Sequence, residues 1–147
     1  MRYFDDFQPG EVSEFGPYVV SREEIIAFAK QFDPQPFHLS DEAAREGIFG
    51  SIVASGWHTA SICHKLIVEG LLGKAASLGS PGLDELRWLK PVRPGDTLSV
   101  RTEVLSTTPS RSKQDRGAIK FRFEVRNQHG DVVMSEVANA LFARRTP

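Results

Sequence analysis

The sequence predicts an α+β fold in which a curved antiparallel sheet wraps around one apolar helix. A chain of 147 residues is the size of one ordinary domain, so we expect a single domain over residues 1–147. Residues 57–69 are apolar on most sides of a helix, which is typical of an enclosed helix. The second half of the chain alternates apolar and polar residues, as strands do. Such a sheet leaves edge strands, which dimerisation commonly covers.

The first half of the chain carries clear start and stop signals for helices. A strand is expected over residues 11–20, weakened by Gly16-Pro17. Ser21 and Glu24 form a capping box for an amphipathic helix that ends at Asp33-Pro34. A second, short helix should run from Ser40-Asp41 through residue 46. The enclosed helix follows and should stop near the glycines at positions 70 and 73.

Long strands are predicted in the second half, over residues 83–92, 96–105, 118–127 and 132–143. Residues 106–117 are polar and poorly patterned, so we expect a mobile loop there. The stretch Leu78-Gly79-Ser80-Pro81-Gly82 is glycine-rich but lacks the lysine and spacing of a phosphate loop, so we expect a plain turn.

Composition excludes several functional classes. The net charge is −1, which gives no electrostatic case for binding nucleic acid or an anionic membrane. No apolar run approaches the roughly 20 residues that span a bilayer, and the N-terminal residues lack the apolar region of a secretion signal. Cys63 is alone, so no intrachain disulfide can form, which fits a reducing compartment. We therefore expect a soluble, cytoplasmic domain.

The segment Phe32-Asp33-Pro34-Gln35-Pro36-Phe37-His38 is the strongest candidate for a catalytic site. Two prolines restrict the loop, so a carboxylate and an imidazole are held before any substrate arrives. Asp33 and His38 could hold one water molecule between them and transfer protons, while Gln35 stiffens the loop. The alternative is structural, because Asp-Pro commonly ends a helix and the histidine could be solvent-exposed.

A second candidate is Ala54-Ser55-Gly56-Trp57, where the apolar helix begins. The first amides of a helix have no intrahelical partner, and glycine lets a ligand oxygen approach the backbone. The amide of Gly56 could therefore bind a thioester oxygen that becomes an enolate. The alternative is an ordinary helix start after a Ser-Gly pair.

Other candidate motifs are weaker. Ser55 does not lie in a G-x-S-x-G elbow, so a serine-hydrolase triad has little support. The spacing of His58, Cys63 and His64 does not bring all three onto one helix face, so no metal site is expected and Cys63 is assigned to the core.

Asp33-Pro34-Gln35-Pro36-Phe37-His38 resembles the D-x-N-P-x-H motif of the MaoC-like dehydratases, the (R)-specific enoyl-CoA hydratase group with a hot-dog fold. The order of elements is similar to the family over nearly the whole chain, including the segment 87–96. The resemblance implies that Asp33 and His38 activate water and return a proton to the α-carbon, and that the Gly56 amide binds the thioester oxygen. It implies a trans-2-enoyl or 3-hydroxyacyl thioester of CoA or an acyl carrier as substrate. No metal or redox cofactor is implied, and a homodimer or dimer of dimers is expected, with its acyl tunnel beside the central helix.

Two departures from the family pattern bear on the substrate. Gln35 replaces the usual Asn of the motif, and Ser55 stands where better-known hydratases carry histidine. We assign Ser55 and Trp57 to substrate binding, with Trp57 narrowing the acyl pocket, so that a shorter, branched or unusual acyl group is as good a candidate as a straight chain. Two alternatives to a hydro-lyase remain: a hot-dog thioesterase, and a non-catalytic acyl-binding subunit of a hetero-oligomer.

Overall fold

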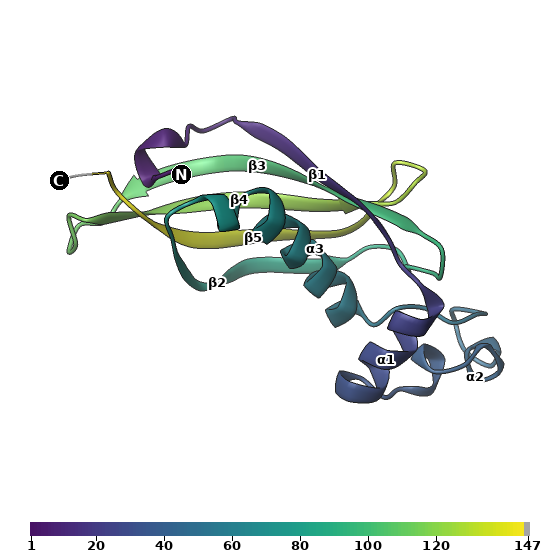
Figure 1. Ribbon diagram of the computed structural model, residues 1–147. Coiled ribbons are helices and arrows are strands. Elements are labelled where there is room, and N and C mark those ends of the chain that lie inside the picture. Colours follow the sequence, from purple (N-terminus) through teal and green to yellow (C-terminus); the bar gives the residue numbers. More distant parts are fainter. Residues whose placement is uncertain (146–147) are drawn as a thin grey trace.

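One antiparallel sheet and one central helix dominate the protein. The computed structural model describes residues 1–145. Within them the sheet has five strands in the order β1-β3-β4-β5-β2, and α3 crosses one of its faces while α1 and α2 lie together beyond one end (Figure 1). The bounds are β1 Val12–Val19, α1 Arg22–Phe32, α2 Asp41–Arg45, α3 Gly56–Gly70, β2 Ser77–Trp88, β3 Thr97–Pro109, β4 Arg116–Arg126 and β5 Val132–Ala143.

Helix α1 begins and ends where its sequence signals place it. Ser21 Oγ accepts from the Glu24 amide at 3.1 Å, and Glu24 Oε1 accepts from the Ser21 amide at 2.7 Å. Ile25 and Ala29 are fully buried on the inner face of the helix. The helix stops at Phe32 because the prolines that follow cannot continue it. The predicted capping box and helix are therefore confirmed.

Helix α3 lies against the inner face of the sheet, as its apolar sequence predicts. Its buried side includes Ile62, Leu66 and Ile67, which join the same core as Val100 and Phe121 of the sheet. Cys63 is fully buried, as expected of a core residue. The side chains of α3 thus form the centre of the hydrophobic core beneath the sheet.

Strand β2 differs from its prediction at both ends. It begins at Ser77 and ends at Trp88, so residues 78–82 lie in a strand and the predicted plain turn there is wrong. Gly79 and Gly82 adopt positive φ values of 101° and 146°, and the pairing with β5 shifts register around them. Glycine serves here to allow bulges in an edge strand, which resemble turn signals in the sequence.

The predicted mobile loop over residues 106–117 is wrong for half of its length. Strand β3 continues to Pro109 and β4 begins at Arg116, so only residues 110–115 connect them. The pairing of the two strands shifts between Val104 and Ser106. This bulge breaks the period-two alternation that identifies a strand in the sequence.

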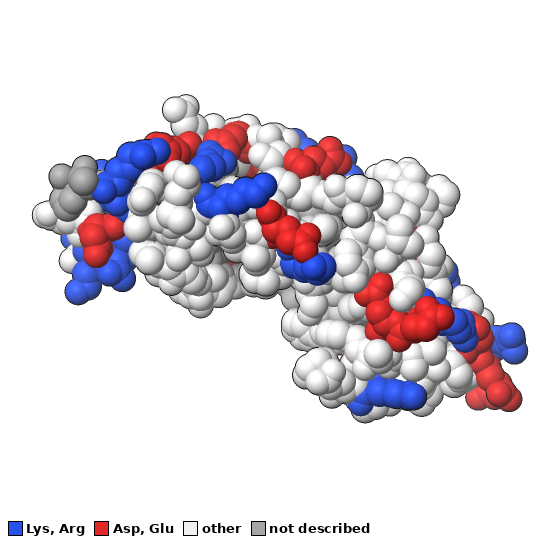
Figure 2. All heavy atoms as spheres, viewed as in Figure 1, with Lys and Arg blue, Asp and Glu red and all other residues white. Residues whose placement is uncertain are grey.

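The surface shows no single-sign patch on the face in view. Lys and Arg side chains are interspersed with Asp and Glu there (Figure 2), which fits the small net charge. No helix within residues 1–145 is long and apolar enough to cross a membrane.

Candidate active site

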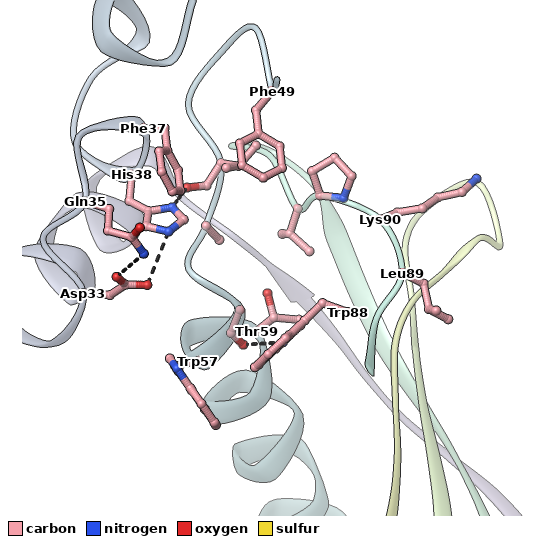
Figure 3. Close-up of a pocket in the computed structure, with 15 residues that line it drawn as sticks. Asp33, Gln35, Phe37, His38, Phe49, Trp57, Thr59, Trp88, Leu89 and Lys90 are labelled. Carbon is pink, nitrogen blue, oxygen red and sulfur yellow. Dashed lines mark hydrogen bonds and ion pairs between the residues drawn. The ribbon is translucent and has the colours of Figure 1, made fainter. Parts of the chain in front are cut away.

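The loop between α1 and α2 folds back on itself and brings Asp33 and His38 together. The Gln35 amide donates to the Asp33 carbonyl at 2.8 Å, and the His38 amide donates to the Gln35 carbonyl at 3.0 Å. Pro36–His38 then form one turn of 3₁₀ helix, with proline at its first position. The stiff loop predicted from the two prolines is therefore a pair of tight turns. The Asp33 and His38 side chains lie on the same side of it (Figure 3).

The His38 ring is held in one orientation. Its Nδ1 lies 2.7 Å from the Val53 carbonyl oxygen, and the side chain is buried, with 5 % of the residue exposed. Because a carbonyl can only accept, Nδ1 must carry the proton in this contact. In the neutral ring, Nε2 is then an acceptor, and it points to Asp33 at 3.3 Å from Oδ2.

The Asp33 carboxylate accepts hydrogen bonds at both oxygens. Gln35 Nε2 donates to Oδ1 at 2.7 Å, and Ser55 Oγ donates to Oδ2 at 2.6 Å. Burial acts to raise the Asp33 pKa, but the hydrogen bonds from Ser55 and Gln35 and the nearby His38 outweigh it and hold that pKa below its usual value. Asp33 is therefore an anion over the neutral range.

Two hydrogen-bond acceptors of the loop thus lie next to each other. When the His38 ring is neutral, its Nε2 offers a lone pair beside Oδ2 of Asp33, and neither atom carries a hydrogen to place between them. A group that donates to both, such as one water molecule, satisfies them together. The arrangement can therefore bind a water and take a proton from it.

Gly56 opens α3 and lies under an indole ring. Trp88 Nε1 donates to the Gly56 carbonyl at 2.8 Å, and a Cβ added to Gly56 would fall 2.5 Å from an atom of the Trp88 ring. Glycine at this position is therefore required by close packing against Trp88. No acceptor within residues 1–145 takes the Gly56 amide hydrogen, so that hydrogen is available at the positive end of the helix.

A cavity of about 420 Å³ joins the two candidate sites. Asp33, Gln35 and His38 lie on one side and Trp57 on the other (Figure 3), and Gly56 also lines the cavity. The remaining lining is mostly apolar, comprising Phe37, Phe49, Val53, Ala54, Thr59, Trp88, Leu89, Lys90, Pro91 and Val92. An apolar cleft with a few convergent polar groups is the usual form of a small-molecule site.

Most of the predicted site residues line the cavity, but not all of them. Asp33, Gln35, His38, Gly56 and Trp57 all line this cavity. Trp57 is 57 % exposed, so it stands at the rim, where its ring meets Trp88 edge-on with centroids 5.0 Å apart.

Ser55 is placed differently from its assignment to substrate binding. It is fully buried behind Asp33, does not line the cavity, and caps α3 by accepting from the Trp57 amide at 3.2 Å. Its direct contacts are therefore with the carboxylate and the helix.

Sequence reasoning assigned no role to Trp88, Thr59 or the Val53 carbonyl. Each meets the site through the tertiary fold: Trp88 comes from the end of β2, and Thr59 lies within α3. A local signal existed only for the capping role of Ser55, because a hydroxyl directly before a helix commonly caps its first turn.

The residues weighed for metal binding are separated. His64 is exposed, whereas His58 and Cys63 are buried, and His58 Nε2 lies 3.4 Å from Glu24 Oε2. Within residues 1–145 no group of three His, Cys, Asp or Glu side chains is arranged to hold a metal ion.

The chain is similar to proteins of one family. The family model described as "MaoC like domain" matches residues 6–122. An uncharacterized protein, YdeM, of Bacillus subtilis is 38 % identical over 110 residues, 74 % of this chain and 77 % of that protein. A 3-hydroxybutyryl-CoA dehydratase of Methylorubrum extorquens is 31 % identical over 112 residues, 76 % of this chain and 69 % of that protein.

A solved structure agrees over the whole chain. The crystal structure of a MaoC-like dehydratase from Rhodospirillum rubrum has 42 % sequence identity and a TM-score of 0.91, covering 99 % of both chains. This chain therefore belongs to the MaoC-like dehydratase family. The five-stranded sheet around a central helix confirms the α+β hot-dog fold that the motif implied.

Proposed function

We propose that this protein is a hydro-lyase that adds water to a trans-2-enoyl thioester, or removes it from a 3-hydroxyacyl thioester, with CoA as the carrier. The observation that carries the proposal is the convergence of Asp33 Oδ2 and His38 Nε2, 3.3 Å apart, on a cavity that Gly56 also lines. The similarity to a 3-hydroxybutyryl-CoA dehydratase of Methylorubrum supports the same reaction class.

In this proposal each group takes one step. The thioester oxygen accepts from the Gly56 amide, which stabilises the enolate that forms when C3 is attacked. A water held by Asp33 and His38 gives its oxygen to C3, and Nε2 of His38 takes the proton released. The imidazolium then delivers that proton to C2, which restores the neutral ring and completes the addition of H and OH. Asp33 remains ionised, orients the water and stabilises the imidazolium.

No metal takes part in this proposed reaction. Its nucleophile is activated by two side chains, and its developing negative charge is met by a backbone amide. CoA enters as the carrier part of the thioester substrate, and the proposed reaction needs no separate cofactor.

The decisive experiment compares hydration of short, branched and medium trans-2-enoyl-CoAs by wild type, Asp33→Asn and His38→Ala. Each variant should lose at least ~10²-fold in kcat with the fold retained, because each removes a group that holds or moves a proton. Asp115→Asn, on the connection between β3 and β4, is the matched control and should keep wild-type turnover. Thiol release from saturated acyl-CoA instead would identify a thioesterase. Binding without turnover on any substrate would identify an acyl-binding subunit.

We further propose a homodimer joined through β2. This strand is an edge of the sheet within the described residues, and it exposes Leu78, Leu83 and Trp88 by 44–48 %. An uncovered apolar edge strand is a natural pairing surface, and a second copy there would stand beside the cavity. Sedimentation of wild type and Leu83→Arg tests this: the variant should shift toward monomer, and an unchanged mass would refute the β2 interface.

A further inference from the structure

Arg93 holds one backbone segment through its side chain. Its Nη2 donates to the Phe49 carbonyl at 2.9 Å, and its Nη1 donates to the Ser51 hydroxyl and, at 3.4 Å, to the Ser51 carbonyl. Within residues 1–145 the backbone of residues 48–51 forms no other hydrogen bond. The guanidinium carries its N–H donors in a fixed plane, so it can hold both carbonyls at once. Residues 49–51 are therefore a segment clamped by Arg93.

The clamped segment has little else to fix its position. It lies in the connection between α2 and α3, outside any helix or strand. Ile48, just before it, is 94 % exposed, so that side chain adds almost no packing. Gly50, within it, has a φ of 76°, in a region that glycine enters at little cost. The hydrogen bonds from Arg93 are therefore the main polar restraint on this segment.

Arg93 itself stands on a rigid turn before β3. Its amide donates to Asp96 Oδ2 at 2.9 Å, and the Asp96 amide donates to the Arg93 carbonyl at 3.1 Å. The carbonyl of the preceding residue, Val92, accepts from the Ala54 amide at 2.8 Å. The guanidinium thus acts from a fixed base, which a side chain that positions another group requires.

The clamped segment leads to two contacts that orient His38. Two residues after Ser51, the Val53 carbonyl oxygen lies 2.7 Å from His38 Nδ1. The Phe49 ring packs on the Phe37 ring with centroids 5.4 Å apart, and the Phe37 ring meets the His38 ring edge-on at 4.4 Å (Figure 3). A shift of the segment would therefore disturb both the carbonyl that keeps the proton on Nδ1 and the aromatic rings beside the imidazole.

We infer that Arg93 is a positioning residue for His38, acting through residues 49–53. The inference rests on the proposed function, in which Nε2 of His38 takes a proton from water and must therefore keep its lone pair free. The Val53 carbonyl enforces that tautomer because a carbonyl can only accept. Without Arg93 the clamped segment is free to move, so the imidazole can turn or change tautomer. A displacement of about 1 Å at a reacting group can cost ~10²-fold in rate.

Nuclear magnetic resonance of protein labelled with ¹⁵N-histidine tests this without requiring turnover. The chain has four histidines, and His38→Ala identifies the His38 signals. At about pH 8, where an ordinary imidazole is neutral, wild type should carry the His38 proton on Nδ1. Arg93→Met should add a second tautomer and lower kcat for hydration of crotonyl-CoA by about 10–10²-fold. Its KM should stay close to that of wild type, because Arg93 does not line the cavity.

Arg93→Lys keeps the charge but not the planar fork, so it should give smaller changes in both readouts. It also keeps the test valid if the methionine variant folds poorly. Arg101→Met is the matched control, because Arg101 is also half-buried but lies on β3 and donates to Glu103. It should keep the wild-type tautomer and kcat.

The wild-type tautomer and kcat in folded Arg93→Met would overturn the inference, even if the variant were less stable. A raised KM with kcat and tautomer unchanged would also overturn it, because Arg93 would then act on substrate binding. A tautomer change in Arg93→Met, with no hydration of any enoyl-CoA by wild type, would uphold the positioning role and refute the proposed reaction.

Discussion

Ser55→Ala tests the electrostatics of the candidate site, because the serine makes one hydrogen bond to the Asp33 carboxylate and one to a helix terminus. Its hydroxyl donates to Asp33 Oδ2 at 2.6 Å and accepts from the Trp57 amide at 3.2 Å, in a fully buried position. Loss of an N-cap costs about 1 kcal/mol, and loss of a hydrogen bond to a charged group about 1.5–3 kcal/mol. We therefore expect the free energy of unfolding to fall by about 2.5–4 kcal/mol.

The same substitution should move the pH dependence of activity. The Asp33 pKa lies below its usual value partly because Ser55 donates to the carboxylate, so removing that bond raises it. Since the proposed reaction needs ionised Asp33, the acid limb of the kcat/KM profile should shift to higher pH. Asp33 stabilises the fold above its unfolded pKa, and that contribution is lost as pH falls through the lowered folded pKa. The stability cost of Ser55→Ala should therefore shrink at strongly acidic pH.

Ser40→Ala is the control for this experiment. Ser40 caps α2 by accepting from the Ala43 amide at 3.2 Å and makes no hydrogen bond to Asp33. It should lose about 1 kcal/mol of stability and keep the wild-type acid limb. If hydration of crotonyl-CoA by folded Ser55→Ala has the same acid limb as wild type, the idea that Ser55 tunes Asp33 is refuted.

Three further expectations concern packing, protonation and metals. Gly56→Ala should lower the free energy of unfolding, measured in urea at fixed protein concentration, by about 1–3 kcal/mol. In a Trp88→Ala background the same substitution should cost much less. If the costs of the two substitutions simply add, the indole does not require the glycine. Burial lowers the pKa of His58, against the influence of Glu24, so the folded state favours the neutral ring and loses stability as pH falls below about 6.5. His58→Gln should reduce the stability difference between about pH 5 and pH 7.5, and an unchanged difference would contradict this. Hydration should survive exhaustive treatment with a metal chelator, and its loss would sink the metal-free reaction.

Much of the site could be predicted because its signals are local in the chain. The capping box at Ser21 and Glu24, the prolines around Gln35 and the apolar run of α3 each act over a few residues, and the structure confirms their helix bounds within one or two residues. The 3.3 Å distance between Asp33 Oδ2 and His38 Nε2 also follows from a short stiff loop. The strand ends at residues 77 and 109 were missed because bulges break the alternation on which strand prediction depends.

The sequence by itself determined the fold class, the family motif and the identity of the two groups that face the cavity. Only the tertiary structure decided what surrounds them. Ser55 meets Asp33 across 22 positions, Trp88 covers Gly56 across 32, and Cys63 meets Glu136 across 73. Contacts at such separations depend on how the sheet, the loop and α3 pack together, because no local preference of the chain encodes them. The proposed proton-transfer chemistry is therefore readable in a short motif, whereas the acidity of its carboxylate and the lining of its pocket are set by the packing.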